Sequence, residues 1–232
     1  MDGSFIHTLE EKRKSIAWRE VKIGFVSNSD NLSEYTTRKG EKAFRLKRKE
    51  YICYLGKYDG FKKYLVYLYV KNKIYLYKKI IIIGDGAEWI KTFRNEFLPN
   101  SIQILDFYHL SERVYEFANF VIKDTNEAKA YACEWCEKLK ESKWKEVINK
   151  LSDFDNIKIP KGIINLKNYI YNNRDSIDYA TYIKNKYFIG SGAIKSVNKF
   201  VTQARLKDPG MIWNKNNAQY LLSLRAKFCS GL

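Results

Sequence analysis

The stretch Ile80–Phe97, "IIIIGDGAEWIKTFRNEF", carries the strongest structural signal in the chain. Four consecutive isoleucines predict a strand that is buried on both faces, as strands of a parallel sheet are. The sequence GDG at 84–86 ends this strand sharply, and the apolar spacing beyond it predicts an amphipathic helix from Ala87 to Phe97. A strand, a tight turn and a helix in this order predict a βα unit.

The next segment, Ser101–Ile122, repeats the scheme. Asn100, after Pro99, turns the chain back, and "SIQIL" predicts a short strand that ends at Leu105. A long helix follows, and we expect Asp106 to cap its first turn, because aspartate is among the preferred N-cap residues. Two consecutive βα units predict two neighbouring parallel strands.

The rest of the chain predicts antiparallel strands at the beginning and helices at the end. The segments "DGSFIHT", "WREVKIGFVS" and "KEYICYLGKY" have the alternation of strands, and residues 60–79 predict a helix that breaks near Lys71 to Lys73. Residues 125–152 and 162–186 have helical patterns, and "GSGAIKSVNKFVTQARLK" predicts a late helix opened by a glycine-rich turn.

These elements predict an α/β fold with a mixed sheet, flanking helices and an all-helical insertion before the last helix. We expect a core of strands and first helices over residues 1–122, the insertion over 123–186, and C-terminal helices that complete the core over 187–232. The longest apolar run, "YLVYLYV", is too short to cross a bilayer, so a soluble cytoplasmic protein without a membrane partner is expected.

The formal charge of +16, from 42 Lys and Arg against 26 Asp and Glu, favours a polyanionic partner, with DNA or RNA as the first candidate. An alternative is codon bias, because the abundant Lys, Ile, Asn and Tyr are all encoded by AT-rich codons. The four cysteines are too few for a disulfide framework. The pair in "CEWC" allows a zinc or redox interpretation, but no further Cys pair or nearby His completes a site, which favours helix packing.

Two aspartates stand where a sheet of this kind binds ligands. Asp85 follows the isoleucine strand, and ligands bind at the carboxyl ends of strands in open α/β sheets. Asp2 begins the first predicted strand. Carboxylates are ligands for Mg²⁺, and two such ions about 4 Å apart can activate a nucleophile and stabilise a leaving oxygen in phosphodiester chemistry. The alternative is that Asp2 belongs to a frayed terminus and Asp85 to a turn.

Five ordered motifs extend this interpretation: "DGSFIHT", "WREVKIG", "GDGAEWI", "DFYH" and "GSGAIKSVNKFVTQARLKDPGMIW". Together they resemble the catalytic domain of bacterial insertion-sequence transposases of the DDE class, in a group similar to the eukaryotic Mutator elements. The resemblance covers nearly the whole chain. It implies an RNase H-like fold that cuts and rejoins DNA with two Mg²⁺ ions held by two aspartates and a glutamate.

By motif, Asp2 and Asp85 match the two aspartates and are the expected metal ligands, while Asp106 and His109 match the family's Asp/Cys-x-x-His element. The third acid belongs in Gly-Ser-Gly-x-Ile-Glu, where this chain has Lys195. Lysine offers donors and no oxygen, so Mg²⁺ affinity is expected to fall steeply. No glutamate follows Glu146, and Asp208 lies more than three helical turns beyond Lys195 at about 1.5 Å per residue; Glu112 remains as a substitute.

The resemblance also implies a segment before the first aspartate, whereas here Met1 directly precedes Asp2. A catalytic aspartate at a fraying terminus is poorly positioned. The expected explanations are a truncated copy with a decayed active site or a fragment translated from an internal start.

Several single residues have two interpretations each. His109 either positions a scissile phosphate or donates a hydrogen bond in the core, and His7 is expected to be structural. Trp89 and Trp213 either pack in the core or stack on an unpaired base. The late helix either contacts the DNA backbone or is a solvated face, and its basic residues are Lys199, Arg205 and Lys207.

The sequence therefore predicts a transposase-like protein that is catalytically impaired at Lys195. The alternative is a non-catalytic DNA-binding remnant that modulates an intact transposase, and a product without function is a third interpretation. Whether the chain forms a homo-oligomer is left open.

Overall fold

The computed structural model describes residues 2–10, 15–36, 40, 42–190 and 198–231. The chain divides into two compact units, of which unit 1 comprises residues 1–78 and 192–232, and unit 2 comprises residues 79–191. Both contain helices and strands, so the predicted mixed α/β class is confirmed. The domain boundaries expected from the sequence, at 122 and 186, stay a prediction.

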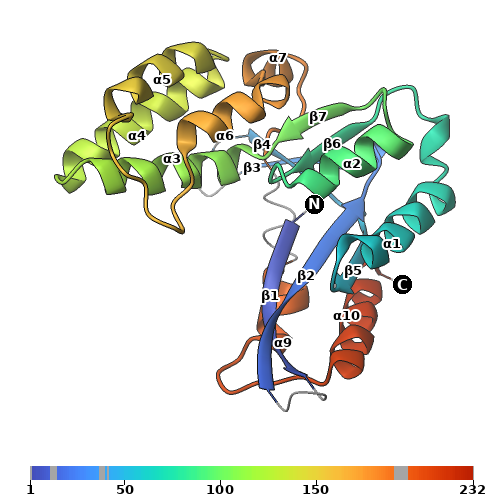
Figure 1. The fold of residues 1–232 in the computed structure, drawn as a ribbon. Coiled ribbons are helices and arrows are strands. Elements are labelled where there is room, and N and C mark those ends of the chain that lie inside the picture. Colours follow the sequence, from blue (N-terminus) through green and yellow to red (C-terminus); the bar gives the residue numbers. More distant parts are fainter. Residues whose placement is uncertain (1, 11–14, 37–39, 41, 191–197, 232) are drawn as a thin grey trace. The chain divides into compact units, whose positions relative to one another are not determined.

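Unit 1 is built on a three-stranded antiparallel sheet in the order β1-β2-β5 (Figure 1). Its strands are β1 (Asp2–Glu10), β2 (Ser15–Val26) and β5 (Glu50–Leu55), and they confirm the three strands predicted at the start of the chain. Asp2 is paired with Ile23, and Val21 with Leu55. Only the second half of β2 pairs with β5, so the rest of β1 and β2 forms a two-stranded ribbon.

Helices cover both faces of this sheet. On one face, alternate strand residues such as Ile6, Val21 and Ile23 pack against α10 (Lys215–Cys229) and the segment before it, which consists of the π-helical turn η5 (Asn198–Gln203) and the short helix α9 (Ala204–Leu206). On the other face lies α1 (Tyr58–Lys71), and a Cβ atom at Gly24 would meet Phe61 Cζ at 3.4 Å. This close approach explains the glycine in the middle of β2.

The region between β2 and β5 differs from the sequence prediction. It was expected only as a basic connection, but it contains the 3₁₀ turn η1 (Ser29–Asn31) and a hairpin of β3 (Leu32–Thr36) and β4 (Lys42–Leu46). The predicted break in the following helix is confirmed, because α1 ends at Lys71, Lys73 has φ 49°, and the 3₁₀ turn η2 (Ile74–Leu76) follows.

Unit 2 contains the two predicted βα units. Strand β6 (Ile81–Gly84) lies parallel to β7 (Ile102–Leu105), and the helices that follow them are α2 (Glu88–Phe97) and α3 (Phe107–Val121). The expected helical segments are also present; they are α4 (Thr125–Lys140), α5 (Trp144–Leu151), η3 (Ser152–Phe154), α6 (Leu166–Asn172), η4 (Arg174–Ser176) and α7 (Tyr179–Lys184).

The core of unit 2 joins its sheet to these helices. Fully buried Trp135 on α4 packs with Phe117 of α3 and with Phe154, and Leu105 of β7 belongs to the same cluster. Cys136 of "CEWC" is buried in this core, and burial raises the pKa of its thiol to about 11. The packing prediction therefore holds for Cys136, whereas Cys133 is exposed and shares a 3.0 Å hydrogen bond with the Tyr115 hydroxyl.

None of the helices in the described part of the chain combines the length and the hydropathy that a bilayer crossing requires.

Candidate functional site

The two strand-end aspartates lie at the same edge of the unit 2 sheet. Gly84 pairs with Leu105 at the ends of β6 and β7, and the amide of Asp106 continues the ladder by donating to the Gly84 carbonyl at 2.7 Å. Asp85 and Asp106 are the residues that follow these strand ends. The parallel register therefore brings two of the predicted site residues of this unit, Asp85 and Asp106, to neighbouring strand ends.

Asp85 belongs to a tightly fixed turn. Its Oδ1 accepts a hydrogen bond from the Ala87 amide at 3.0 Å, and its carbonyl accepts one from the Tyr169 hydroxyl at 2.9 Å. Gly86 follows with φ +81°, and the Asn173 side chain, 4 % exposed, lies against it. The half-buried Asp85 carboxylate is thus held at the strand end by the backbone of its own turn and by a tyrosine of α6.

Asp106 has a different environment. Its side chain is fully buried, and its Oδ1 accepts a hydrogen bond from the Tyr108 amide at 2.8 Å. This geometry confirms that Asp106 caps α3, as the sequence predicted. A buried carboxylate aimed at a helix N-terminus has less room for an added ligand than the half-buried Asp85.

His109 lies on the first turn of α3 with 22 % of its side chain exposed. Its Nδ1 is 3.6 Å from Oε2 of the more exposed Glu112, which was the substitute acid that the sequence left open. One residue further along the helix, Arg113 forms an ion pair with Glu116 at 2.8 Å. The beginning of α3 thus presents a histidine, an acid and an arginine.

The glycine-rich motif begins beside "DFYH". The Phe107 amide donates to the Ile189 carbonyl at 2.8 Å, and Gly190 lies so close to Tyr108 that a Cβ atom would be 2.5 Å from ring atom Cδ2. A side chain at position 190 would therefore displace that ring. The continuation of this motif, with Lys195, lies outside the described residues.

Two tyrosines support the strand ends from the helical segments. The fully buried Tyr179 donates its hydroxyl to the Leu105 carbonyl at 2.9 Å, and Tyr169 donates to that of Asp85. Burial raises the pKa of both hydroxyls, and the negative charges of Asp85 and Asp106 raise the pKa of Tyr169 further. The sequence analysis missed both residues, because a tyrosine in a helical pattern carries no signal of what its hydroxyl reaches.

We expect these two tyrosines to make unit 2 unstable in alkali. Above about pH 10 the unfolded chain releases their protons while the folded chain retains them, so the free energy of unfolding falls as pH rises, by up to about 1.4 kcal/mol per pH unit for each tyrosine. Urea unfolding at about pH 8 and about pH 11 measures this fall, and Tyr169→Phe should reduce it. Equal free energies of unfolding at both values would contradict the assignment.

The remaining predicted site residues lie in unit 1. Asp2 pairs with Ile23 through the backbone of β1, and the Asn198 side chain donates to the carbonyl of neighbouring Gly3 at 3.4 Å. The start of β1 therefore lies beside the start of η5. The basic residues proposed for DNA contact, Lys199, Arg205 and Lys207, are exposed.

The contacts of Trp213 and His7 bear on the interpretations that the sequence analysis offered for these side chains. Trp213 packs against the unit 1 core, and its indole N–H donates to the Leu206 carbonyl at 3.2 Å, which confirms the packing interpretation. Trp89 on α2 is half-buried. His7 lies on β1 with its ring centroid 3.8 Å from that of Trp18, a structural contact of the kind expected.

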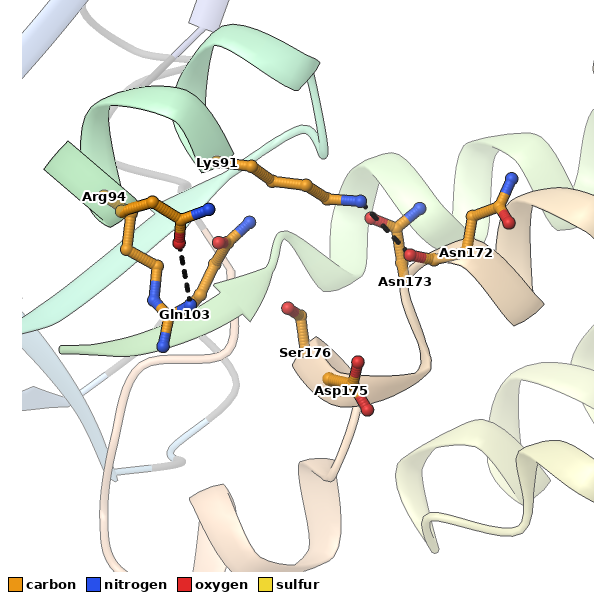
Figure 2. Close-up of a pocket in the computed structure, with 8 residues that line it drawn as sticks. Lys91, Arg94, Gln103, Asn172, Asn173, Asp175 and Ser176 are labelled. Carbon is orange, nitrogen blue, oxygen red and sulfur yellow. Dashed lines mark hydrogen bonds between the residues drawn. The ribbon is translucent and has the colours of Figure 1, made fainter. Parts of the chain in front are cut away.

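A polar pocket of about 150 Å³ lies between α2, β7 and the end of α6 (Figure 2). Backbone carbonyls already engage its two cations, since Lys91 Nζ donates to the Asn172 carbonyl at 3.1 Å and the Arg94 guanidinium donates to that of Ser101 at 3.1 and 3.2 Å. These bonds tie α2 to the neighbouring segments. The pocket is lined by Lys91, Arg94, Asn95, Gln103, Asn172, Asn173, Asp175 and Ser176.

Asp85 fits the requirements of a Mg²⁺ ligand better than Asp106 does. Mg²⁺ commonly takes one or two protein carboxylates together with waters and phosphate oxygens. Asp85 uses one oxygen for its turn, and its other oxygen accepts no hydrogen bond from the described residues. No three His, Cys, Asp or Glu side chains gather as a metal site in the described part of the chain, and the Asp2 side chain is not among those described.

The fold and the site define a mixed α/β protein with two aspartates at the carboxyl ends of adjacent parallel strands. The chain belongs to the uncharacterised protein family UPF0236, whose model matches residues 13–232. Asp85, Asp106, His109 and Lys195 lie within the matched residues, and Asp2 precedes them. A comparison with curated proteins gives no match.

Proposed function

We propose that this protein is a transposase-like protein of the DDE class, with an RNase H-like fold, and that its DNA strand cleavage and transfer are impaired. The observation that carries the proposal is the meeting of three motifs at one sheet edge. Asp85 of "GDGAEWI" and Asp106 of "DFYH" follow paired strand ends, and Gly190 of the glycine-rich motif packs on Tyr108. The proximity of three motifs that are far apart in the sequence supports a common site.

In this proposal Asp2 and Asp85 would hold Mg²⁺, and His109 would face the scissile phosphate. Mg²⁺ bound there would supply a Lewis acid for phosphodiester chemistry. The chain's own contribution is positional. Tyr169 and the Ala87 amide fix the turn that carries Asp85, so the carboxylate meets its ligand without reorganisation.

Lys195 is the reason for expecting impaired catalysis. An ammonium in the position of a carboxylate repels a divalent cation and provides no oxygen to coordinate it. The charge at that position is reversed rather than merely removed. We therefore expect that the wild-type protein does not cut DNA and that the lesion resides in one side chain.

The experiment compares DNA strand cleavage and joining by the wild-type protein and by Lys195→Glu, in Mg²⁺ and in Mn²⁺, on DNA that carries the element's ends. Cleavage by Lys195→Glu alone is the expected result. Mg²⁺-dependent cleavage by the wild-type protein would refute the impairment. Absence of cleavage by both proteins, with DNA binding retained, would reject the catalytic role of Asp2 and Asp85 and favour the second function.

That second function is DNA binding without catalysis, as a remnant that modulates an intact transposase. It is favoured by the exposed basic residues of the late helical segment, Lys199, Arg205 and Lys207. Binding through such residues weakens with salt and does not require Mg²⁺. The two functions can therefore be distinguished by metal dependence: DNA cleavage requires Mg²⁺, whereas DNA binding through basic residues does not.

A further inference from the structure

A cluster of positive charges lies at the end of β4 and in the connection from β4 to β5 in unit 1. The sequence "RLKRK" at residues 45–49 has four cations, which we call the hairpin cluster: Arg45, Lys47, Arg48 and Lys49. The first three are exposed, and Lys49 is half-buried. None of the four forms an ion pair with any described residue.

The hairpin cluster differs from a group of lysines in unit 2 whose charges are paired with carboxylates. In unit 2, the helical segments hold five lysines that each pair with a carboxylate: Lys138 with Glu146, Lys140 with Glu137, Lys143 with Glu141, Lys150 with Glu134, and Lys167 with Asp155. Beside the hairpin, Glu50 at the start of β5 is already occupied by Lys71 and Asn72, and Asp30 of η1 accepts a hydrogen bond from Asn28. These two acids therefore do not neutralise the hairpin cluster.

The like charges of the cluster are held close together. Burial, and then the positive charge of Arg45, lower the pKa of Lys49, which shows that the two cations repel each other. The base of the hairpin is fixed, because the Lys47 amide donates to the Asn31 carbonyl at 2.8 Å and the Ser27 hydroxyl donates to the Arg48 carbonyl. Cations that a fold holds together without acids are stabilised by an anion that binds among them.

One face of the hairpin adds an aromatic platform. Arg45 pairs with Ser33 across the strands, and its guanidinium lies 5.6 Å from the centroid of the Tyr35 ring, which is 41 % exposed. A guanidinium stacked on a ring keeps its N–H groups available in its own plane for phosphate oxygens. Glu34 alternates to the opposite face of the strand, so the face of Arg45 and Tyr35 carries no carboxylate from β3.

From these observations we infer that the β3–β4 hairpin and the connection that follows it form a DNA-binding arm, and that the hairpin cluster contacts the phosphate backbone of double-stranded DNA. A two-stranded antiparallel ribbon has the width to enter the major groove, and phosphate contacts come mainly from Arg and Lys. The choice of DNA as the polyanion rests on the proposed function. The arm itself requires neither Mg²⁺ nor an intact carboxylate set.

The test uses two triple variants of the full chain that lose the same formal charge. Arg45→Gln, Lys47→Gln and Arg48→Gln remove the exposed part of the hairpin cluster, and Lys140→Gln, Lys143→Gln and Lys150→Gln remove paired lysines of unit 2. Exposed ion pairs contribute about 0 to 1 kcal/mol each, so the control protein should fold. Thermal unfolding verifies both proteins before binding is measured.

Affinity for a fluorescent mixed-sequence duplex of about 30 base pairs is measured by anisotropy over a range of NaCl concentrations. The hairpin variant should bind at least about tenfold more weakly at about 0.1 M salt, and its plot of log affinity against log salt should be less steep by about 3, because each phosphate contact contributes about 0.9 to that slope. The control should stay within about twofold of the wild-type protein. Equal losses in both variants, or wild-type affinity in the hairpin variant, would overturn the inference.

A second measurement needs no substitution. Bound DNA should protect Lys47 and Lys49 of the wild-type protein from amine acetylation and leave Lys143 reactive, as read by mass spectrometry; unchanged reactivity of Lys47 and Lys49 would overturn the inference. The same binding assay with Asp85→Asn separates DNA binding by this arm from catalysis. Because the arm does not require an intact carboxylate set, this variant should bind DNA with the affinity of the wild-type protein. If the arm contacts DNA but neither the wild-type protein nor Lys195→Glu cuts it, the inference of a DNA-binding arm is supported and the proposed catalytic function is rejected.

Discussion

Asp85→Asn should lower Mg²⁺-dependent cleavage by the Lys195→Glu protein by about a hundredfold or more, whereas Asp106→Asn should lower it by less than about fivefold. The two aspartates follow neighbouring strand ends, yet their surroundings differ. The Asp85 carboxylate is half-buried, and one of its oxygens accepts no hydrogen bond from the described residues. Asparagine at this position keeps an oxygen that accepts from the Ala87 amide and loses the negative charge that the proposed function assigns to Mg²⁺ binding.

Asp106 should respond to a different kind of change. Asparagine also caps helices, so Asp106→Asn preserves the acceptor for the Tyr108 amide. Asp106→Ala removes that acceptor and leaves a cavity in a fully buried place, which should lower the free energy of unfolding by about 2 kcal/mol. The expected pattern is thus loss of activity without loss of stability at Asp85, and loss of stability without loss of activity at Asp106.

Cleavage rates of the double variants and urea unfolding of the same proteins measure the two effects. Asp85→Asn alone, without Lys195→Glu, is the control for stability. A collapse of cleavage in Asp106→Asn that matches the loss in Asp85→Asn would show that Asp106 acts in the chemistry, as the motif resemblance implies, and not only as a helix cap.

The sequence was sufficient to predict the elements that hold the strand-end aspartates. Four consecutive isoleucines followed by Gly-Asp-Gly predicted β6 and its turn. An aspartate directly before a segment with helical spacing of apolar residues predicted the cap of α3. These signals are local, because strand burial and capping involve residues close together in the chain. The parallel pairing followed from the two βα units.

Contacts between distant residues could not be predicted in this way. Tyr169 reaches the Asp85 carbonyl across 84 positions, and nothing in the pattern around Tyr169 distinguishes its hydroxyl from that of an exposed tyrosine. The β3–β4 hairpin was missed because its strands have five residues each and neither "LSEYT" nor "KAFRL" alternates strictly between apolar and polar residues. The π-helical turn at Asn198 replaced part of a regular predicted helix, since helical periodicity does not distinguish the two forms.

Gly86→Ala should produce the largest loss of stability among the changes at this site, about 3 kcal/mol in the free energy of unfolding. Gly86 has φ +81°, a backbone conformation that costs an L-residue about 1 kcal/mol. A Cβ atom there would also lie 2.9 Å from Leu105 Cδ1 and 3.1 Å from Asn173 Oδ1, both of which are buried. Neither neighbour can withdraw without disturbing the end of β7 or the end of α6.

Gly210→Ala is the matched control, because Gly210 has the same φ of +81° and nothing lies within 4 Å of its Cβ position. Gly210→Ala should lower the free energy of unfolding only by the cost of the backbone conformation, about 1 kcal/mol. The unfolding temperature should therefore fall by about 3 °C for Gly210→Ala and by about 9 °C for Gly86→Ala. The difference between the two variants measures the crowding around the Asp85 turn. Equal shifts would mean that the turn relaxes freely and that Leu105 and Asn173 do not hold Asp85 in place.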